Sequence, residues 1–85
     1  MKINLLFFAS LRESLETNRE EIDLPDQITN VGDLRQWLLA RGPAWEAALG
    51  QGQAVRVAVN QALAEADTAL TPGAEVAFFP PVTGG

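Results

Sequence analysis

Lys-Ile-Asn-Leu-Leu-Phe-Phe at residues 2–8 opens the chain, and Glu-Val-Ala-Phe-Phe at residues 75–79 stands near its other end. The first stretch is rich in residues that favour β-strands, and its near-continuous apolarity is typical of a central strand. The second stretch is predicted to be the last strand. Because side chains alternate between the two faces of a strand, Phe8 and Phe79 are expected to point away from their inward-facing neighbours.

Between these strands the sequence predicts one main helix. Asn30 is a typical N-cap residue with Asp33 three positions later, and the apolar spacing that follows predicts a helix over residues 31–41. Gly42 is expected to close this helix in a left-handed conformation. Shorter helical turns are predicted near residues 9–15 and 45–49, and further strands at residues 19–24, 54–59 and 62–64.

This order of elements resembles the ubiquitin-like β-grasp. That fold belongs to the α+β class, and a mixed sheet of about five strands packs on one main helix. Its first and last strands lie side by side and parallel at the centre of the sheet. The two most apolar strands of this sequence are the first and the last, which agrees with that arrangement.

The composition limits the kinds of function. The chain has 85 residues, of which 47% are hydrophobic, so a single domain with one modest core is expected. Eleven acidic and six basic residues give a net charge of −5, which disfavours binding to nucleic acid or anionic membranes and favours a basic protein partner. Neither an apolar run of about 18 residues nor a signal peptide is evident, so cytoplasmic residence is the default expectation.

The chain contains no cysteine and no histidine. Thiol nucleophiles, thiolate metal sites and the commonest general base are therefore absent. No metal site is expected, and the chain is not expected to catalyse a reaction by itself.

Pro-Pro-Val-Thr-Gly-Gly at residues 80–85 follows the last predicted strand. Proline fixes φ and removes a hydrogen-bond donor, so residues 1–79 are predicted to form the domain and residues 80–85 an extended tail. Gly84 and Gly85 carry no Cβ, and they can enter a channel too narrow for side chains. A frayed chain end is the alternative, but the adjoining Phe78, Phe79 and Val82 are unlike a disordered tail, so the sequence favours a reactive role for the carboxylate of Gly85.

Three segments together resemble the MoaD family, the small subunits of molybdopterin synthase. They are Leu-Phe-Phe-Ala-Ser-Leu-Arg-Glu at residues 6–13, Ala-Val-Asn-Gln at residues 58–61 and Glu-Val-Ala-Phe-Phe-Pro-Pro-Val-Thr-Gly-Gly at residues 75–85. The resemblance covers the whole chain. One departure is Glu16, where many members have glycine, and it bears on the turn between the first two strands.

The resemblance implies a sulfur carrier for molybdenum cofactor biosynthesis, the non-catalytic subunit of a sulfurtransferase complex. An E1-like, MoeB-like adenylyltransferase would use ATP to activate Gly85, and a sulfur donor protein would convert it to 1-thioglycine, a thiocarboxylate. The sulfur would then pass to cyclic pyranopterin monophosphate in a MoaE-like large subunit, within a heterotetramer. No cofactor bound by the chain itself is implied.

Phe8, Leu63 and Phe79 are expected to form an exposed apolar patch beside the tail, at positions that the family uses for partner contact. The alternative is that these side chains complete a second small core. The tail residues expected to contact a partner are Pro80, Pro81, Val82 and Thr83.

Other side chains are expected to have structural roles. Trp37 and Trp45 are predicted to pack against the core, and Arg12 and Arg56 to form surface ion pairs. The acidic residues predicted to form a solvated face are Glu13, Glu16, Glu20, Glu21 and Asp23.

Three other functions remain open from the sequence. The same terminus could be conjugated to lysines, as in ubiquitin-like protein modifiers, or could carry sulfur for thiamine synthesis. A β-grasp interaction module whose tail is never activated is the third.

Overall fold

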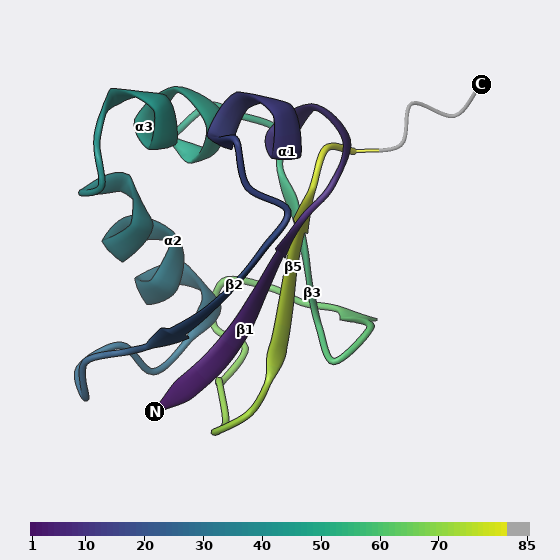
Figure 1. The fold of residues 1–85 in the computed structure, drawn as a ribbon. Helices are drawn as coiled ribbons and strands as arrows, with labels where there is room; N and C mark the ends of the chain where they lie inside the picture. Colours follow the sequence, from purple (N-terminus) through teal and green to yellow (C-terminus); the bar gives the residue numbers. More distant parts are fainter. Residues whose placement is uncertain (82–85) are drawn as a thin grey trace.

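The computed structural model describes residues 1–81 and has a mixed sheet with three helices (Figure 1). The strands are β1 (Lys2–Phe7), β2 (Arg19–Asp23), β3 (Arg56–Val59), β4 (Ala62–Leu63) and β5 (Glu75–Phe79). The helices are α1 (Ala9–Leu15), α2 (Val31–Leu39) and α3 (Pro43–Leu49). None of the helices in this part of the chain has the length and apolarity needed to span a membrane.

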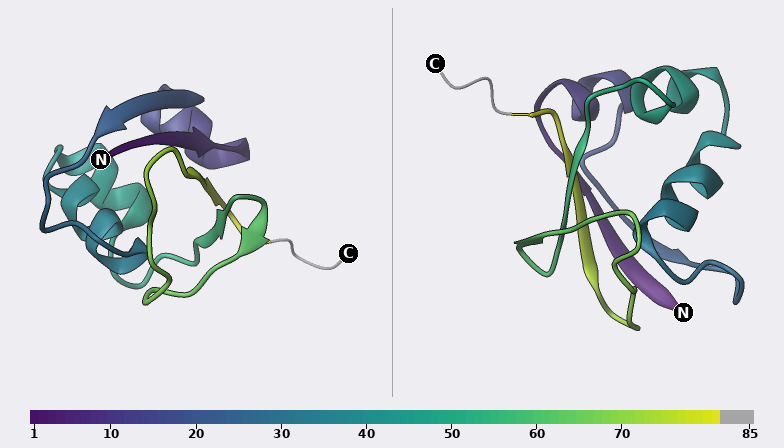
Figure 2. Two further views of the ribbon diagram at one scale, coloured as in Figure 1. Left: turned by 90° about the horizontal axis from the view of Figure 1, so that it is seen from below. Right: turned by 180° about the vertical axis from the view of Figure 1, so that it is seen from behind.

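The five strands follow the order β2-β1-β5-β3-β4. β1 and β5 are parallel neighbours, and the other pairs are antiparallel. The predicted β-grasp sheet is confirmed, because the first and last strands of the sequence, β1 and β5, lie side by side inside the sheet. In Figures 1 and 2, α2 lies against one face of the sheet, while α1 and α3 cover the end at which β1 and β5 finish. Among the elements of residues 1–81, no helix covers the opposite face of the sheet.

The core lies between the sheet and the helices. Alternation along β1 and β5 turns one set of side chains inward, and the helices contribute leucines that are also fully buried. Phe7 stacks on Phe78 with ring centroids 5.6 Å apart and meets Trp45 edge-on at 5.5 Å. The largest fully buried side chains are Phe7, Phe78, Ile3, Leu5, Leu34, Leu38, Leu49 and Val76.

The main helix begins as predicted but ends earlier. The Asp33 N–H donates to the side-chain oxygen of Asn30 at 2.7 Å, which satisfies one of the free donors of the first turn. The helix stops at Leu39 instead of residue 41. Gly42 does not close it, because this glycine, at φ 143° and ψ −179°, is the N-cap of α3. Proline is favoured at the first position of a helix, so α3 begins at Pro43 and Gly42 precedes this helix instead of ending α2.

Arg41 joins β2 to the two tryptophans. Its guanidinium donates two hydrogen bonds to the Glu20 carboxylate, at 2.9 and 2.7 Å. The same group lies 5.6 Å from the ring centre of Trp37 and 4.7 Å from that of Trp45, within cation–π range. Both tryptophans pack against the core, as predicted. Glu20 does not belong to the predicted solvated face, because it lies on the helix side of β2 and is paired.

The Glu20–Arg41 pair makes stability depend on pH. Hydrogen bonds from Arg41 are the main cause that lowers the pKa of Glu20, and partial burial opposes them. A lowered pKa in the folded state means that the stabilisation is present above the ordinary glutamate pKa and is lost as the pH falls through the folded value. Glu20→Gln is therefore expected to cost up to about 1 kcal/mol at neutral pH.

The measurement is urea unfolding from about pH 7 to about pH 3, where the deficit of the variant should shrink towards zero. Glu21→Gln is the matched control, since Glu21 is exposed on the same strand. A deficit that does not change with pH would show that the pair contributes through packing instead of charge.

The turn after α1 contains a left-handed residue that is not glycine. Glu16 has φ 55° and ψ 36°, and its N–H donates to the carbonyl of Arg12. This is the position at which the resemblance singled out a departure from glycine. A side chain costs about 1–2 kcal/mol in this conformation, whereas glycine adopts it freely.

Glu16→Gly is expected to raise the free energy of unfolding by roughly 0.5–1 kcal/mol, because relief of strain exceeds the added entropy of the unfolded chain. Glu13→Gly should have the opposite sign, since Glu13 is exposed inside α1 and glycine there costs roughly 0.5–1 kcal/mol. Thermal unfolding of both variants checks the pair. Destabilisation by both would mean that Glu16 is not strained.

Two tight turns complete the sheet. Asn60 and Gln61 link β3 to β4 with φ 49° and 70°, so this predicted turn forms without glycine. The side chain of Asn60 accepts a hydrogen bond from the N–H of Glu75 at 3.0 Å, which ties the turn to β5. Gly73, at φ 82°, precedes β5 in the predicted turn over residues 71–74, and the Ala74 N–H donates to Thr71 at 3.0 Å.

Candidate functional site

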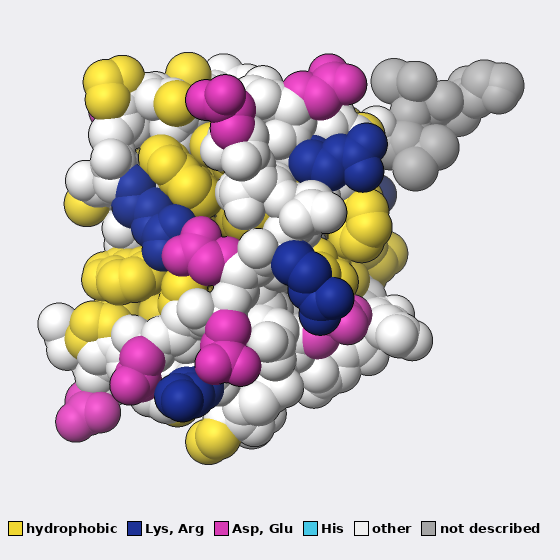
Figure 3. All heavy atoms as spheres, in the orientation of Figure 1, with side chains coloured by type: hydrophobic (Ala, Val, Ile, Leu, Met, Phe, Trp, Pro, Cys, Tyr) yellow, Lys and Arg dark blue, Asp and Glu magenta, His cyan; other side chains and the backbone are white. Residues whose placement is uncertain are grey.

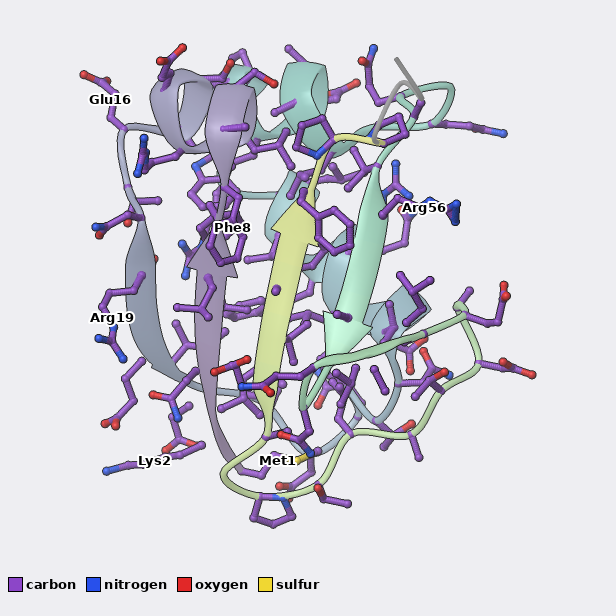
Figure 4. All side chains as sticks on the ribbon, turned by 90° about the vertical axis from the view of Figure 1, so that its right-hand side faces the viewer. Met1, Lys2, Phe8, Glu16, Arg19 and Arg56 are labelled. Carbon is purple, nitrogen blue, oxygen red and sulfur yellow. The ribbon has the colours of Figure 1, made fainter. Side chains whose placement is uncertain are left out.

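The uncovered face of the sheet, here called the open face, is turned to the viewer in Figure 4. Residues directly opposite each other on paired strands point to the same face. Leu6 is opposite Ala77, Ala77 is opposite Ala58, and Ala58 is opposite Leu63. An apolar row therefore crosses four strands of the open face.

A second row lies next to the first, towards the end of β1 and β5. Phe78 pairs with Phe7 in the ladder, so the following residues, Phe79 and Phe8, are neighbours on the open face. The N–H of Phe8 donates to the carbonyl of Phe78 at 3.1 Å, which continues the pairing to this point. The two rows make one surface, the apolar patch, which consists of Leu6, Phe8, Ala58, Leu63, Ala77 and Phe79.

Two predicted docking residues are strongly exposed. Phe8 keeps 46% of its surface accessible and Leu63 keeps 69%. Phe79 is half-buried, so it is less accessible than predicted. Because so much of both side chains faces solvent, Phe8 and Leu63 do not complete a second core, and together they mark a candidate interface.

The patch includes three residues that were not predicted as contacts. Leu6 and Ala77 alternate with inward residues of β1 and β5, and Ala58 does so on β3. Period-two alternation alone could have identified them. Ala77 is only 7% exposed, because it is small and has a strand on each side. It contributes flatness to the patch instead of contact area.

The described part of the tail begins at the patch. β5 ends at Phe79, Pro80 is half-buried and Pro81 is exposed, and neither proline extends the strand. A partner that covers the apolar patch therefore lies beside the point where the chain leaves the sheet. The predicted contact residues Val82 and Thr83 and the predicted reactive residues Gly84 and Gly85 lie outside the described residues.

Basic side chains border the apolar patch. Arg19 is opposite Leu6 across the β1–β2 pair, and Arg56 is opposite Phe79 across the β3–β5 pair. Figure 4 shows Phe8 between them, with Arg19 on the β2 side and Arg56 on the β3 side. In the space-filling view of Figure 3, Lys and Arg side chains adjoin hydrophobic side chains at the right-hand, sheet side.

The ion pairs differ from those predicted. Within residues 1–81 they join Arg41 to Glu20 at 2.7 Å and the N-terminal amine to Asp23 at 3.4 Å. Arg12 and Arg56, predicted to form surface ion pairs, take part in neither. The two arginines beside the patch locally oppose the net charge of −5, and the basic partner expected from that net charge stays a prediction.

A hollow of about 320 Å³ adjoins the patch near β3 and β4, and its lining includes Arg35, Arg56, Leu63 and Glu65. Arg35 is already engaged there, since its guanidinium donates to the carbonyls of Leu49 at 2.6 Å and of Gly50 and Gln53 at 3.1 Å. These bonds hold the connection between α3 and β3. The hollow is therefore the border of the patch, with a structural arginine in its wall.

The arrangement is suited to docking. Residues 1–81 contain no group of three or more acidic side chains placed to hold a metal ion. The described surface offers an apolar patch, two flanking arginines and the origin of the tail at one edge.

Comparison with known proteins gives consistent matches. The model of the ThiS family matches residues 5–85. A molybdopterin synthase sulfur carrier subunit from Escherichia coli strain K12 is 47% identical over 85 residues, covering 98% of this chain and 99% of that protein. A protein of the same name from Haemophilus influenzae is 41% identical over 83 residues, covering 98% and 99%.

A solved structure shows the same fold. The crystal structure of SAMP1, a small archaeal modifier protein from Haloferax volcanii, matches with a TM-score of 0.80 and 30% identity, covering 100% of both chains.

Proposed function

The chain belongs to the ThiS family, and from this premise we propose that it is the sulfur carrier subunit of a molybdopterin synthase. The observation that carries the proposal is the apolar patch at the origin of a tail that ends in Gly84 and Gly85. The patch supplies docking and the tail supplies the reactive group. Relatives at 41–47% identity along nearly their whole length carry the same name, which supports this function.

Sulfur is proposed to travel as a thiocarboxylate on Gly85. A carboxylate resists substitution because its leaving group would be oxide, so an activating enzyme must first transfer AMP from ATP to it, releasing pyrophosphate. The outer sulfur of a persulfide on a donor protein then displaces AMP and forms an acyl disulfide. A second thiol cleaves the S–S bond of this intermediate, which leaves the thiocarboxylate on Gly85 and a disulfide on the donor side. The chain has neither cysteine nor histidine, so no side chain of its own can carry a persulfide in place of the terminus.

The proposed partner in sulfur transfer is the large subunit of molybdopterin synthase. In its active site the sulfur would pass to cyclic pyranopterin monophosphate. The apolar patch would bind that subunit, and the tail beginning at Pro80 would enter its active site. A MoeB-like adenylyltransferase would use the same surface at another step. One patch can serve both partners because the two encounters are separated in time.

Intact mass spectrometry tests the function. The protein is incubated with ATP, the activating enzyme and a sulfur donor, then mixed with the large subunit and the pterin substrate. We expect first a mass increase equal to exchange of one oxygen for sulfur at Gly85, then loss of that increase as product forms. An unchanged mass at both stages would refute the carrier function and favour an interaction module with an inert tail.

A protein modifier is the second candidate, because SAMP1 matches the whole chain at 30% identity. It predicts an isopeptide bond between Gly85 and a lysine of another protein. Peptide fragmentation of cell extracts separates the candidates, since only conjugation leaves a C-terminal fragment of this chain, joined through Gly85, on target lysines. Sulfur exchange without such fragments supports the carrier alone. For a thiamine-type carrier, the charged protein would supply sulfur to thiazole synthesis and not to the pterin.

A further inference from the structure

Each side of the apolar patch is bordered by an arginine with no carboxylate partner among residues 1–81. Arg19 is opposite Leu6 and Arg56 is opposite Phe79, and both arginines are exposed. Directly opposite residues have Cβ atoms about 5 Å apart, so both side chains start next to the apolar surface. A partner seated on the patch must also lie close to these two charges.

The acidic residues of the open face lie further along the strands. Asn4 has an acidic residue opposite it on each side, Glu21 on β2 and Glu75 on β5, one row beyond the Leu6 row. Asp23 is opposite Lys2 near the far end of β1. Asp23 already lies 3.4 Å from the N-terminal amine. Glu65 lines the hollow that Arg56 also lines, yet they form no ion pair in the described part of the chain. Positive charge thus gathers at the patch although the chain as a whole is acidic.

We propose that the surface covering the apolar patch carries two separate carboxylate groups, one facing Arg19 and one facing Arg56, and that they select the cognate large subunit. This inference rests on the proposed function. Burial of an unpaired guanidinium is costly, whereas complementary charges at an interface rim speed association and reject partners of like charge. The apolar contacts provide affinity for the partner, and the two arginines provide specificity.

The geometry requires two acidic sites on the partner instead of one. β2 and β3 are three strand steps apart in the sheet order. At about 4.8 Å per step, the backbones of Arg19 and Arg56 are roughly 15 Å apart. This distance exceeds the screening length of about 10 Å at 0.1 M salt, so each arginine acts independently and the effects of their substitution should multiply.

Charge reversal tests the proposal. Arg19→Glu, Arg56→Glu and the double variant are compared with the parent for binding to the purified large subunit, by stopped-flow measurement at low and high salt. Lys2→Glu is the matched control, because Lys2 is exposed on the same face at the far end of β1, opposite Asp23, and its reversal changes the charge equally. Thermal unfolding confirms that every variant remains folded.

We expect each arginine reversal to slow association about 10-fold at about 0.1 M salt and the double variant about 100-fold, with the differences shrinking at higher salt. Lys2→Glu should change the rate less than about 3-fold. Unchanged rates for Arg19→Glu and Arg56→Glu, or an equal effect of Lys2→Glu, would overturn the inference while the parent still binds. Absence of binding by the parent would instead overturn the proposed function, and this inference with it.

Discussion

Deletion of Gly85 is expected to abolish sulfur transfer while leaving the domain folded. Removing one residue withdraws the terminal carboxylate by about 3.5 Å along the chain. A displacement of about 1 Å at a reacting centre can already cost 10²-fold in rate, so a loss of at least that size is expected. Within residues 1–81 the buried core runs from Ile3 to Phe78, so thermal unfolding should be unchanged.

Gly84→Val should cause a comparable loss for a different reason. The terminal carboxylate keeps its position in the sequence, but a β-branched side chain stands beside it and excludes positive φ. Gly84→Ala gives a graded control, and a protein with Gly85 capped as an amide gives an inactive reference of full length. Product formation at the parental rate by the deletion or the valine variant would contradict the assigned role of the terminus.

The second large effect is expected at the docking surface. Phe8→Asp and Leu63→Asp should each weaken binding of the large subunit by about 2 kcal/mol or more, roughly 30-fold in Kd, which is the scale of interface hot spots. Because Leu63 is 69% exposed, its replacement should change stability by no more than about 0.5 kcal/mol. Titration calorimetry and thermal unfolding of the same samples provide the two measurements.

Ala47→Asp is the matched control, since Ala47 is exposed on α3 and its substitution introduces the same charge away from the patch. If Ala47→Asp weakens binding as much as Leu63→Asp, added negative charge is the cause and the apolar contact is not. If Leu63→Asp lowers stability without changing Kd, the side chain serves the fold.

Much of the fold could be predicted because local patterns agreed with one another. The apolar first strand, the Asn30 cap and the proline–glycine turn before β5 each gave a correct element. The predicted end of α2 was wrong because Gly42 could either end one helix or precede the next. In the structure it precedes α3, which begins at Pro43. A single glycine between two helical segments does not show which of them it bounds.

The candidate site was predictable only as far as alternation reaches. Alternation placed Phe8 on the open face, but it could not give the exposure of Phe79, which depends on neighbours from β1 and β3. The positions of Arg19 and Arg56 beside the patch were not predicted, because they follow from strand register. Net charge is a sum over the whole chain, so it does not show that positive side chains lie beside the patch of an acidic protein.

The central position of β5 has a mechanical consequence. The tail leaves from the end of β5, which is hydrogen-bonded to β1 on one side and to β3 on the other. A pull on the tail, as when it is withdrawn from a tight channel, acts along this strand and loads all of those bonds together in shear. They would have to break collectively instead of one after another, so repeated extraction should leave the domain intact for reuse.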